Sequence, residues 1–248
     1  QSKLQASDAV AADYFGARVA ATPEILVAGA TGKSSGAGAA YVFSYALNEV
    51  SSTIYTMTWT QEQKLEAPDQ LPGDAFGSSL AVSQDNSVIA VGATGDDDLG
   101  SNAGAVYLFT NDGSASSSGE YAWSYQAKLY PSDGAAGDSF GHTVSVMTYS
   151  TTHAEKDIAV GAYGHDSNRG QVYIFHENVQ TSGLVTPIRT WSQSSVLRPY
   201  GGGAEQDNFG AGVAFSRDGL NLLTTSHRSD RGGSVHNYYN ADAVSSSS

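Results

Sequence analysis

The sequence has no cysteine, few basic residues and no long apolar run. Without cysteine, disulfides, thiolate zinc sites and a cysteine nucleophile are excluded. Lys and Arg number 12 against 25 Asp and Glu, for a net charge of -13. Phosphate binding needs clustered basic side chains, so we expect no nucleic-acid partner and no anionic membrane surface. No apolar run approaches the roughly 20 residues of a membrane-spanning helix, so direct membrane insertion is not expected.

Sequence signatures of catalysis are also missing. None of the six histidines has a zinc-binding spacing such as H-E-x-x-H, no serine lies in G-x-S-x-G, and there is no phosphate loop. No window shows a convincing helical period of 3.6 residues. We therefore expect an all-β protein that is not an enzyme.

What the sequence does contain is one unit repeated four times. Phe-Gly recurs at spacings of 61, 64 and 69 residues, and an Asp stands two residues before each Phe. The four phenylalanines are Phe15, Phe76, Phe140 and Phe209. Their aspartates are Asp13, Asp74, Asp138 and Asp207. A Trp precedes three of the copies, at Trp59, Trp123 and Trp191. A period of this length indicates a repeat architecture.

Each copy reads as four short strands. Segments of 5–8 residues rich in Val, Ile, Tyr and Phe are bounded by Gly, Asp, Asn or Ser, as in FGSSLAVS, VIAVGATG and GAVYLF of the second copy. The fourth segment holds the Trp and a Leu. Four antiparallel strands per unit are typical of a propeller blade. We predict a single β-propeller domain of four blades over residues 1–240, followed by a Ser-rich tail at 241–248.

The ends of the chain bear on how such a ring closes. Residues 2–6 read SKLQA, like the end of a fourth strand, whereas the last copy stops after the third-strand segment GSVHNYY. We predict that the N-terminal segment completes the last blade. The alternative is four consecutive blades of a larger ring, completed by another chain or by residues outside this sequence.

Together these motifs, W…KL…D…D-x-FG…VGA…G…Y-V-F, resemble the FG-GAP repeat of integrin α-subunit propellers and related surface proteins. The third motif residue departs at Thr31, Thr94 and Tyr163, which replace Pro, and the fourth copy departs most, at Thr224-Thr225-Ser226. The resemblance implies an extracellular adhesion or scaffolding role and calcium in blade loops. The D-x-D-x-D-G calcium segment that the resemblance implies is absent here.

Other acidic loops are candidates for Ca²⁺, which prefers carboxylate oxygen. Adjacent carboxylates repel one another unless they are solvated or bridged by a cation. The candidate ligands are Asp96, Asp97, Asp98, Asp133, Asp138 and Asp166. The alternatives are a solvated acidic loop and, for the Asp before each Phe-Gly, a carboxylate that accepts backbone N–H groups and fixes the turn.

The leading functional hypothesis is a non-catalytic extracellular module for protein–protein contact within a cell-surface or filament assembly. The alternative is a glycan-binding, lectin-like propeller, since loop aromatics can stack on sugar faces. The aromatic candidates for that alternative are Tyr130, Tyr163 and Tyr200.

Overall fold

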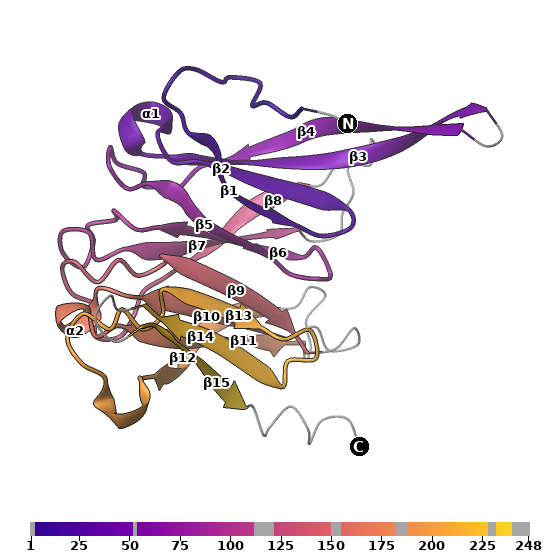
Figure 1. Cartoon of the computed structure of the whole chain (residues 1–248). Helices are drawn as coiled ribbons and strands as arrows, with labels where there is room; N and C mark the ends of the chain where they lie inside the picture. Colours follow the sequence, from indigo (N-terminus) through magenta and orange to yellow (C-terminus); the bar gives the residue numbers. More distant parts are fainter. Residues whose placement is uncertain are drawn as a thin grey trace.

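The computed structural model describes residues 3–51, 54–111, 122–149, 155–181, 188–227 and 232–239 (Figure 1). These residues form an all-β structure whose strands lie in four antiparallel sheets. The sheets follow one another along the chain, one per Phe-Gly unit, which confirms the all-β prediction. The predicted Ser-rich tail at 241–248 lies outside the described residues.

Each sheet keeps its strands in sequence order. Sheet 1 holds β1 (Phe15–Ala21), β2 (Ile25–Ala30), β3 (Ala39–Ser51) and β4 (Ile54–Leu65). Sheet 2 holds β5 (Phe76–Val82), β6 (Val88–Ala93), β7 (Ala105–Asn111) and β8 (Trp123–Leu129). Sheet 3 holds β9 (Thr143–Thr148), β10 (Lys156–Ala162), β11 (Gln171–Gln180) and β12 (Ile188–Leu197). Sheet 4 holds β13 (Gly212–Phe215), β14 (Asn221–Ser226) and β15 (Ser234–Tyr239).

The short helical turns all lie in loops. Turn α1 (Lys33–Gly36) follows β2, α2 (His165–Asn168) follows β10, and the 3₁₀ turn η1 (Tyr200–Gly202) precedes sheet 4. Left-handed residues interrupt α1 and α2, so neither is a regular helix. No helix among the described residues is long and apolar enough to cross a membrane.

The core lies between successive sheets. Strands β6 and β10 are buried at every position, as expected for strands covered on both faces. One apolar cluster joins sheets 1 and 2, a second joins sheets 2 and 3, and a third joins sheets 3 and 4. The first strands also contact one another in the series β1, β5, β9, β13. Each sheet therefore buries its faces against its neighbours in the chain.

The repeated phenylalanine fills these interfaces. Phe76, Phe140 and Phe209 are fully buried. Phe76 packs edge-to-face on Tyr107 and Phe109 of its own sheet and belongs to the cluster shared with sheet 1. Aromatic pairs in this arrangement contribute beyond the area that they bury. Burial between sheets thus gives the repeated phenylalanine its role in the second, third and fourth units.

Glycines let neighbouring sheets approach at the backbone. A Cβ added to Gly92 would lie 2.1 Å from the carbonyl oxygen of Gly141, and one on Gly161 would lie 2.0 Å from that of Gly210. The Gly of each V-G-A segment thus faces the Gly of the next Phe-Gly. A residue larger than glycine at Gly92 or Gly161 would therefore force the backbone to shift.

The predicted closure by the N-terminal segment is wrong in this structure. Residues 3–14 form no strand, and sheet 4 has three strands among the described residues. Leu4 and Ala6 instead pack on Tyr41 and Phe43 of sheet 1. Sheet 1, on which this segment lies, and β15 of sheet 4 are at opposite ends of the molecule (Figure 1). The segment stays with sheet 1 because Ser7 and Asp8 hydrogen-bond to side chains of that sheet, Gln61 and Tyr41.

Candidate functional site

Polar side chains gather at one edge of the sheets, which we call the loop edge. It comprises the loops between second and third strands, where α1 and α2 lie, and the connections that lead into each Phe-Gly (Figure 1). All six aspartates predicted as cation ligands belong to these loops.

The Asp before each Phe-Gly fixes the turn into the first strand. In all four units its carboxylate accepts a hydrogen bond from the backbone N–H three residues earlier. The bonds are Val10 to Asp13 at 2.8 Å, Leu71 to Asp74 at 2.6 Å, Ala135 to Asp138 at 2.9 Å and Ala204 to Asp207 at 2.6 Å. The turn-forming hydrogen bond expected of these aspartates is present in all four units, Asp138 included.

A second repeated Asp lies five residues earlier and accepts a tyrosine hydroxyl from the third strand. The pairs are Tyr41 to Asp8 at 2.6 Å, Tyr107 to Asp69 at 2.8 Å and Tyr173 to Asp133 at 2.7 Å. Burial, reinforced by the nearby carboxylate, raises the pKa of Tyr41 and Tyr173 above the usual range. The hydrogen bond from Tyr41, aided by Lys64 and Lys33, lowers the pKa of Asp8 to about 2.

In sheet 2 a lysine ammonium occupies the centre of the acidic cluster. Lys128 Nζ lies 2.7 Å from Asp96 Oδ2, 2.7 Å from Asp98 Oδ2 and 2.9 Å from Asp69 Oδ2. Burial by itself would lower the pKa of Lys128, but hydrogen bonds to the carboxylates outweigh it and raise the pKa. Three carboxylates are thus bridged by a cation from the protein itself.

Asp97 does not join this cluster. Its carboxylate accepts the backbone N–H of Asn102 at 2.7 Å and so orders the β6–β7 loop. Tyr130 donates its hydroxyl to Asp98 at 2.6 Å, which ties the connection after β8 to the same loop. Within the run Asp96 to Asp98, Asp96 and Asp98 therefore pair with Lys128, whereas Asp97 orders the loop.

In sheets 1 and 3, the corresponding carboxylates lie beside other side chains than in sheet 2. In sheet 1, Lys33 Nζ lies 3.0 Å from Asp13 and 3.4 Å from Asp8, and Lys64 lies 3.1 Å from Asp8. In sheet 3, His165 stands at the position of Lys33, with Nδ1 2.9 Å from Asp138 and Nε2 3.9 Å from Asp133. Val196 replaces the repeated lysine there.

The structure therefore groups the predicted cation ligands in two clusters. Asp96 and Asp98 meet on Lys128, Asp133 and Asp138 meet on His165, and Asp166 is exposed and paired with Arg169 at 2.8 Å. No set of three or more His, Asp or Glu side chains in the described part of the chain is arranged to hold a metal. The calcium prediction from the sequence is not tested by these contacts, but the Lys128 ammonium already occupies the place between Asp96 and Asp98.

The sequence interpretation missed the cations that complete these clusters, Lys128 and Lys33. A signal existed for the lysine, since Lys precedes the repeated Leu in three copies, at Lys3, Lys64 and Lys128. Lysine in a strand otherwise predicted to be half-buried indicates an acidic partner, because a buried ammonium needs a counter-charge.

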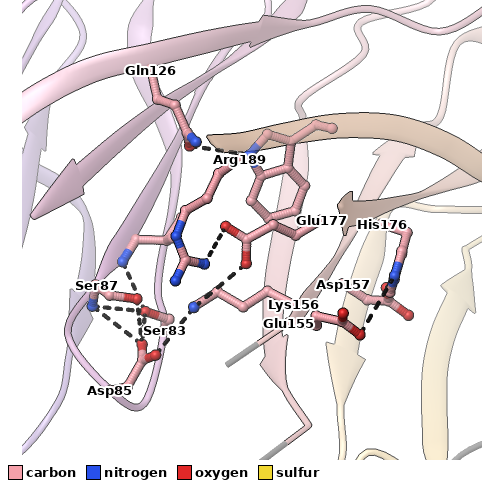
Figure 2. A network of polar contacts seen from close by, with 12 residues as sticks. Ser83, Asp85, Ser87, Gln126, Glu155, Lys156, Asp157, His176, Glu177 and Arg189 are labelled. Atoms are coloured by element: carbon pink, nitrogen blue, oxygen red, sulfur yellow. Dashed lines mark hydrogen bonds and ion pairs between the residues drawn. The ribbon is translucent and has the colours of Figure 1, made fainter. Parts of the chain in front are cut away.

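A second polar network lies at the opposite edge, between sheets 2 and 3 (Figure 2). Lys156 is 0% exposed and lies 3.1 Å from Asp85 and 3.6 Å from the equally buried Glu177. Arg189 pairs with Glu177 at 2.8 Å. The charges alternate in sign from Asp85 to Arg189 and sum to zero, so the network joins the β5–β6 turn to sheet 3 without a net buried charge.

A histidine–carboxylate pair flanks this network (Figure 2). His176 Nδ1 lies 2.8 Å from Asp157, whose other oxygen accepts the hydroxyl of Tyr149, and Glu155 lies 4.0 Å from His176 Nε2. Such a pair could orient a base for a hydroxyl nucleophile. Here Asp157 accepts the hydroxyl of Tyr149, and the carboxylate of Glu155 lies near the other ring nitrogen of His176. The pair of Asp157 and His176 links the two middle strands of sheet 3.

Comparison with known proteins adds the family. No curated protein matches the sequence. The family profile of the FG-GAP repeat matches residues 1–43, 59–109 and 123–175, more than half of the chain. These matches include the first three Phe-Gly units. The fourth unit, which departs most in sequence, is not covered, but Phe209 packs on Tyr238 as Phe76 does on Phe109. The chain belongs to the FG-GAP repeat family.

Proposed function

We propose that this protein is a non-catalytic module for contacts with other proteins, outside the cell or at a cell surface, within a surface or filament assembly. We also propose that its four sheets are consecutive blades of a β-propeller. The family supports the proposal, because FG-GAP repeats suggest a protein-binding module and are typically non-catalytic.

The observation on which the proposal depends is the set of exposed apolar side chains on the loop edge. Large apolar side chains stand out from the connections into sheets 1, 2 and 4 and from the β6–β7 loop. They are Val10, Tyr14, Leu71, Leu99 and Tyr200. Apolar anchors among charged groups are typical of protein interfaces. The carboxylates beside them favour a partner with basic side chains.

The polar groups of the same edge are engaged with one another. Asp96 and Asp98 bridge Lys128, Asp138 holds its turn and accepts His165, and Tyr107 is bonded to two carboxylates. A nucleophile needs an adjacent free base. Each of the groups named here is already bonded to a structural partner, and this pairing supports a binding role rather than catalysis.

The test compares binding by variants of two exposed regions. The purified chain, fluorescently labelled, is added to intact cells and to extracellular-matrix extract, and specific binding is measured against unlabelled competitor. We expect Leu71→Ser with Leu99→Ser to lower the affinity at least about tenfold, as loss of interface anchors does. Leu47→Ser with Met57→Ser, which changes exposed side chains of the β3–β4 hairpin, is the control. Equal binding by both double variants would exclude the loop edge as the interface.

The glycan-binding alternative depends on Tyr200. Of its three candidate residues, Tyr130 donates a hydrogen bond to Asp98, and Tyr163 packs edge-to-face on His142 with ring centroids 4.5 Å apart. Tyr200 is 97% exposed, with Pro199 before it and Gly201 after it, so its ring is free to stack on a sugar. A glycan array separates the two functions: hits that Tyr200→Ser abolishes would favour the lectin, and an empty array would leave protein contact.

A further inference from the structure

The two residues that follow each Phe-Gly differ in chemistry from unit to unit. They stand at or beside the start of the first strands, and β1, β5, β9 and β13 contact one another in series. The pairs, which we call the inner row, are Ala17-Arg18, Ser78-Ser79, His142-Thr143 and Ala211-Gly212. Because the Phe-Gly before them is constant, the inner row is a place where the four sheets can differ in function.

In sheets 2 and 3 the second residue of each pair joins its sheet to the next. Its hydroxyl donates a hydrogen bond to the carbonyl of the following Phe-Gly. The bonds are Ser79 to Gly141 at 2.6 Å and Thr143 to Gly210 at 3.0 Å. Arg18 has the same position in sheet 1, but its guanidinium donates to the carbonyl of its own neighbour Ala17 at 2.9 Å. Sheet 1 thus has a charged side chain where the next two sheets have a joining hydroxyl.

Arg18 has no acidic partner in the described part of the chain. Its side chain is exposed and forms no ion pair there, whereas Arg169 and Arg189 each pair with a carboxylate. The register of β1 shifts between Phe15 and Val19, and bulges of this kind redirect side chains next to functional sites. A residue that departs from the pattern of its repeat without a structural gain is expected at such a site.

Two imidazoles lie near this arginine. His142 of the inner row is half-buried against Tyr163, and His227, which follows β14, is exposed. Burial lowers the pKa of His142, and the positive charges of Arg18 and His227 lower it further. The groups that face His142 are therefore one aromatic ring and two basic side chains, with no described carboxylate to offset them. We call Arg18, His142 and His227 the basic cluster.

A buried hydroxyl of the inner row is left without a partner. The oxygen of Ser78 is buried and has no hydrogen-bond partner among the described residues. Ser78 has in sheet 2 the position that His142 has in sheet 3, and it lies in a second bulge, between Phe76 and Ser79. Buried polar atoms without a partner are rare. Since sheet 2 packs between sheets 1 and 3, the inner row offers this hydroxyl together with the basic cluster.

We propose that the basic cluster binds a carboxylate, with the guanidinium of Arg18 as the main contact and the imidazole of His142 as the second donor. The planar fork of a guanidinium matches the two oxygens of a carboxylate. One permanent cation also matches the single charge of that group. Acidic amino-acid side chains and acidic sugars both carry it. The inference goes beyond the loop-edge proposal and is tested without a partner protein, so either can fail alone.

The first measurement is the pKa of His142, followed by NMR of the imidazoles and assigned with His142→Gln. The probes are N-acetyl-aspartate amide, whose one carboxylate is a side chain, and galacturonate, an acidic sugar. We expect saturation with at least one of them to raise the pKa of His142 by about 1, because a nearby anion favours the imidazolium. Sodium chloride at equal ionic strength is the control, since salt weakens repulsion within the cluster. A rise no larger than that with chloride for both probes would overturn the proposal.

Arg18→Ser tests the main contact, because serine is the residue at the same position of sheet 2. We expect the pKa of His142 in the free protein to rise, since one positive charge is removed, and the further rise caused by carboxylate to be lost. The melting temperature should stay equal or increase, because the new hydroxyl can join sheet 1 to sheet 2 as Ser79 joins sheet 2 to sheet 3. Arg169→Ser, at an exposed arginine, is the control and should change neither pKa. A full carboxylate effect in Arg18→Ser would overturn the assignment.

The pH dependence of binding tests the role of His142. Its imidazole loses its positive charge as pH rises through its pKa, whereas Arg18 stays charged, so the affinity for carboxylate should fall between about pH 5 and pH 8. A pKa that rises by about 1 on binding corresponds to a fall of about tenfold. Calorimetric titration with the probe that gives the larger NMR effect would measure the fall. An affinity that does not change with pH would overturn the role of His142 as second donor.

Discussion

At the scale of single residues, the phenylalanine of each unit owes its role to what covers it. Phe76 lies fully buried between two sheets, whereas Phe15 is only partly buried because no other sheet of the described residues packs on its side of sheet 1. The same residue type in the same motif thus has two environments. The same substitution, Phe to Ala, can therefore be made at both positions to compare what each environment contributes to the free energy of unfolding.

We expect Phe76→Ala to lower the free energy of unfolding by about 3–5 kcal/mol, the usual cost of deleting a large core side chain. Phe15→Ala is the matched control and should cost less, because part of its ring is already in water. Urea unfolding followed by tryptophan fluorescence measures both. A loss below about 1 kcal/mol for Phe76→Ala would contradict its placement between sheets.

The carboxylate of Asp8 gives a second residue-scale prediction. Its pKa in the folded protein is about 2, below the ordinary 3.8, chiefly because Tyr41 donates a hydrogen bond to it. A lowered pKa contributes stability above pH 3.8, and the contribution is lost as pH falls toward 2. We expect Tyr41→Phe to raise the pKa of Asp8 toward 3.8.

Carbon-detected NMR titration of the Asp8 carboxyl would measure this shift. Tyr45→Phe is the control, since Tyr45 packs on Trp59 rather than on a carboxylate. If the pKa of Asp8 stays near 2 in Tyr41→Phe, the lysines Lys33 and Lys64 hold the carboxylate down instead.

At the scale of elements, the contacts between sheets combine apolar packing with buried charge. Lys156 at the start of β10 reaches Asp85 in the β5–β6 turn of the preceding sheet and Glu177 of β11. A buried ion pair adds little over an apolar substitute, but breaking it leaves an unpaired charge. The network therefore specifies how sheets 2 and 3 meet at this edge.

We expect Lys156→Met to cost about 3–5 kcal/mol, because Glu177 would remain buried with one partner fewer. Lys156→Met with Glu177→Met should recover part of that loss, since both charges are then removed. Lys3→Met, at an exposed position, is the control and should be within about 0.5 kcal/mol of the parent chain. Equal losses in the single and double variants would show that the charges do not interact.

At the scale of the whole molecule, the acidic surface bears on calcium. Lys128 already bridges Asp69, Asp96 and Asp98, and His165 lies between Asp133 and Asp138. A divalent cation between Asp96 and Asp98 would have to displace or repel the Lys128 ammonium, and one at Asp138 would have to compete with the His165 ring for the carboxylate. We expect millimolar Ca²⁺ to leave the melting temperature unchanged.

Scanning calorimetry with Ca²⁺ and with a chelator would measure this. Mg²⁺ at equal ionic strength is the control for general screening of the net charge of -13. A saturable rise in melting temperature specific to Ca²⁺ would place a calcium site on the chain and contradict the assignment of the lysines as the resident cations.

Much of the local structure could be predicted from the sequence. The repeat of Phe76 and its counterparts, the continuous apolar run of strands such as VIAVGA, and the turn-forming Asp74 are local patterns, and the structure has each where it was expected. These features depend on residues close together in the chain, whose geometry backbone chemistry restricts.

Other features were decided only by the tertiary structure. Lys128 meets Asp69 across 59 residues, and Lys156 meets Asp85 between two sheets, so neither contact has a local signature. The position of the N-terminal segment also depends on the whole arrangement. The sequence of this segment resembles a last strand whether it lies beside sheet 4 or on sheet 1. How far the segment lies from sheet 4 depends on the packing of each sheet on the next. The sequence determined the repeating unit. Where the two ends of the described chain lie was decided only by the way the four sheets pack on one another.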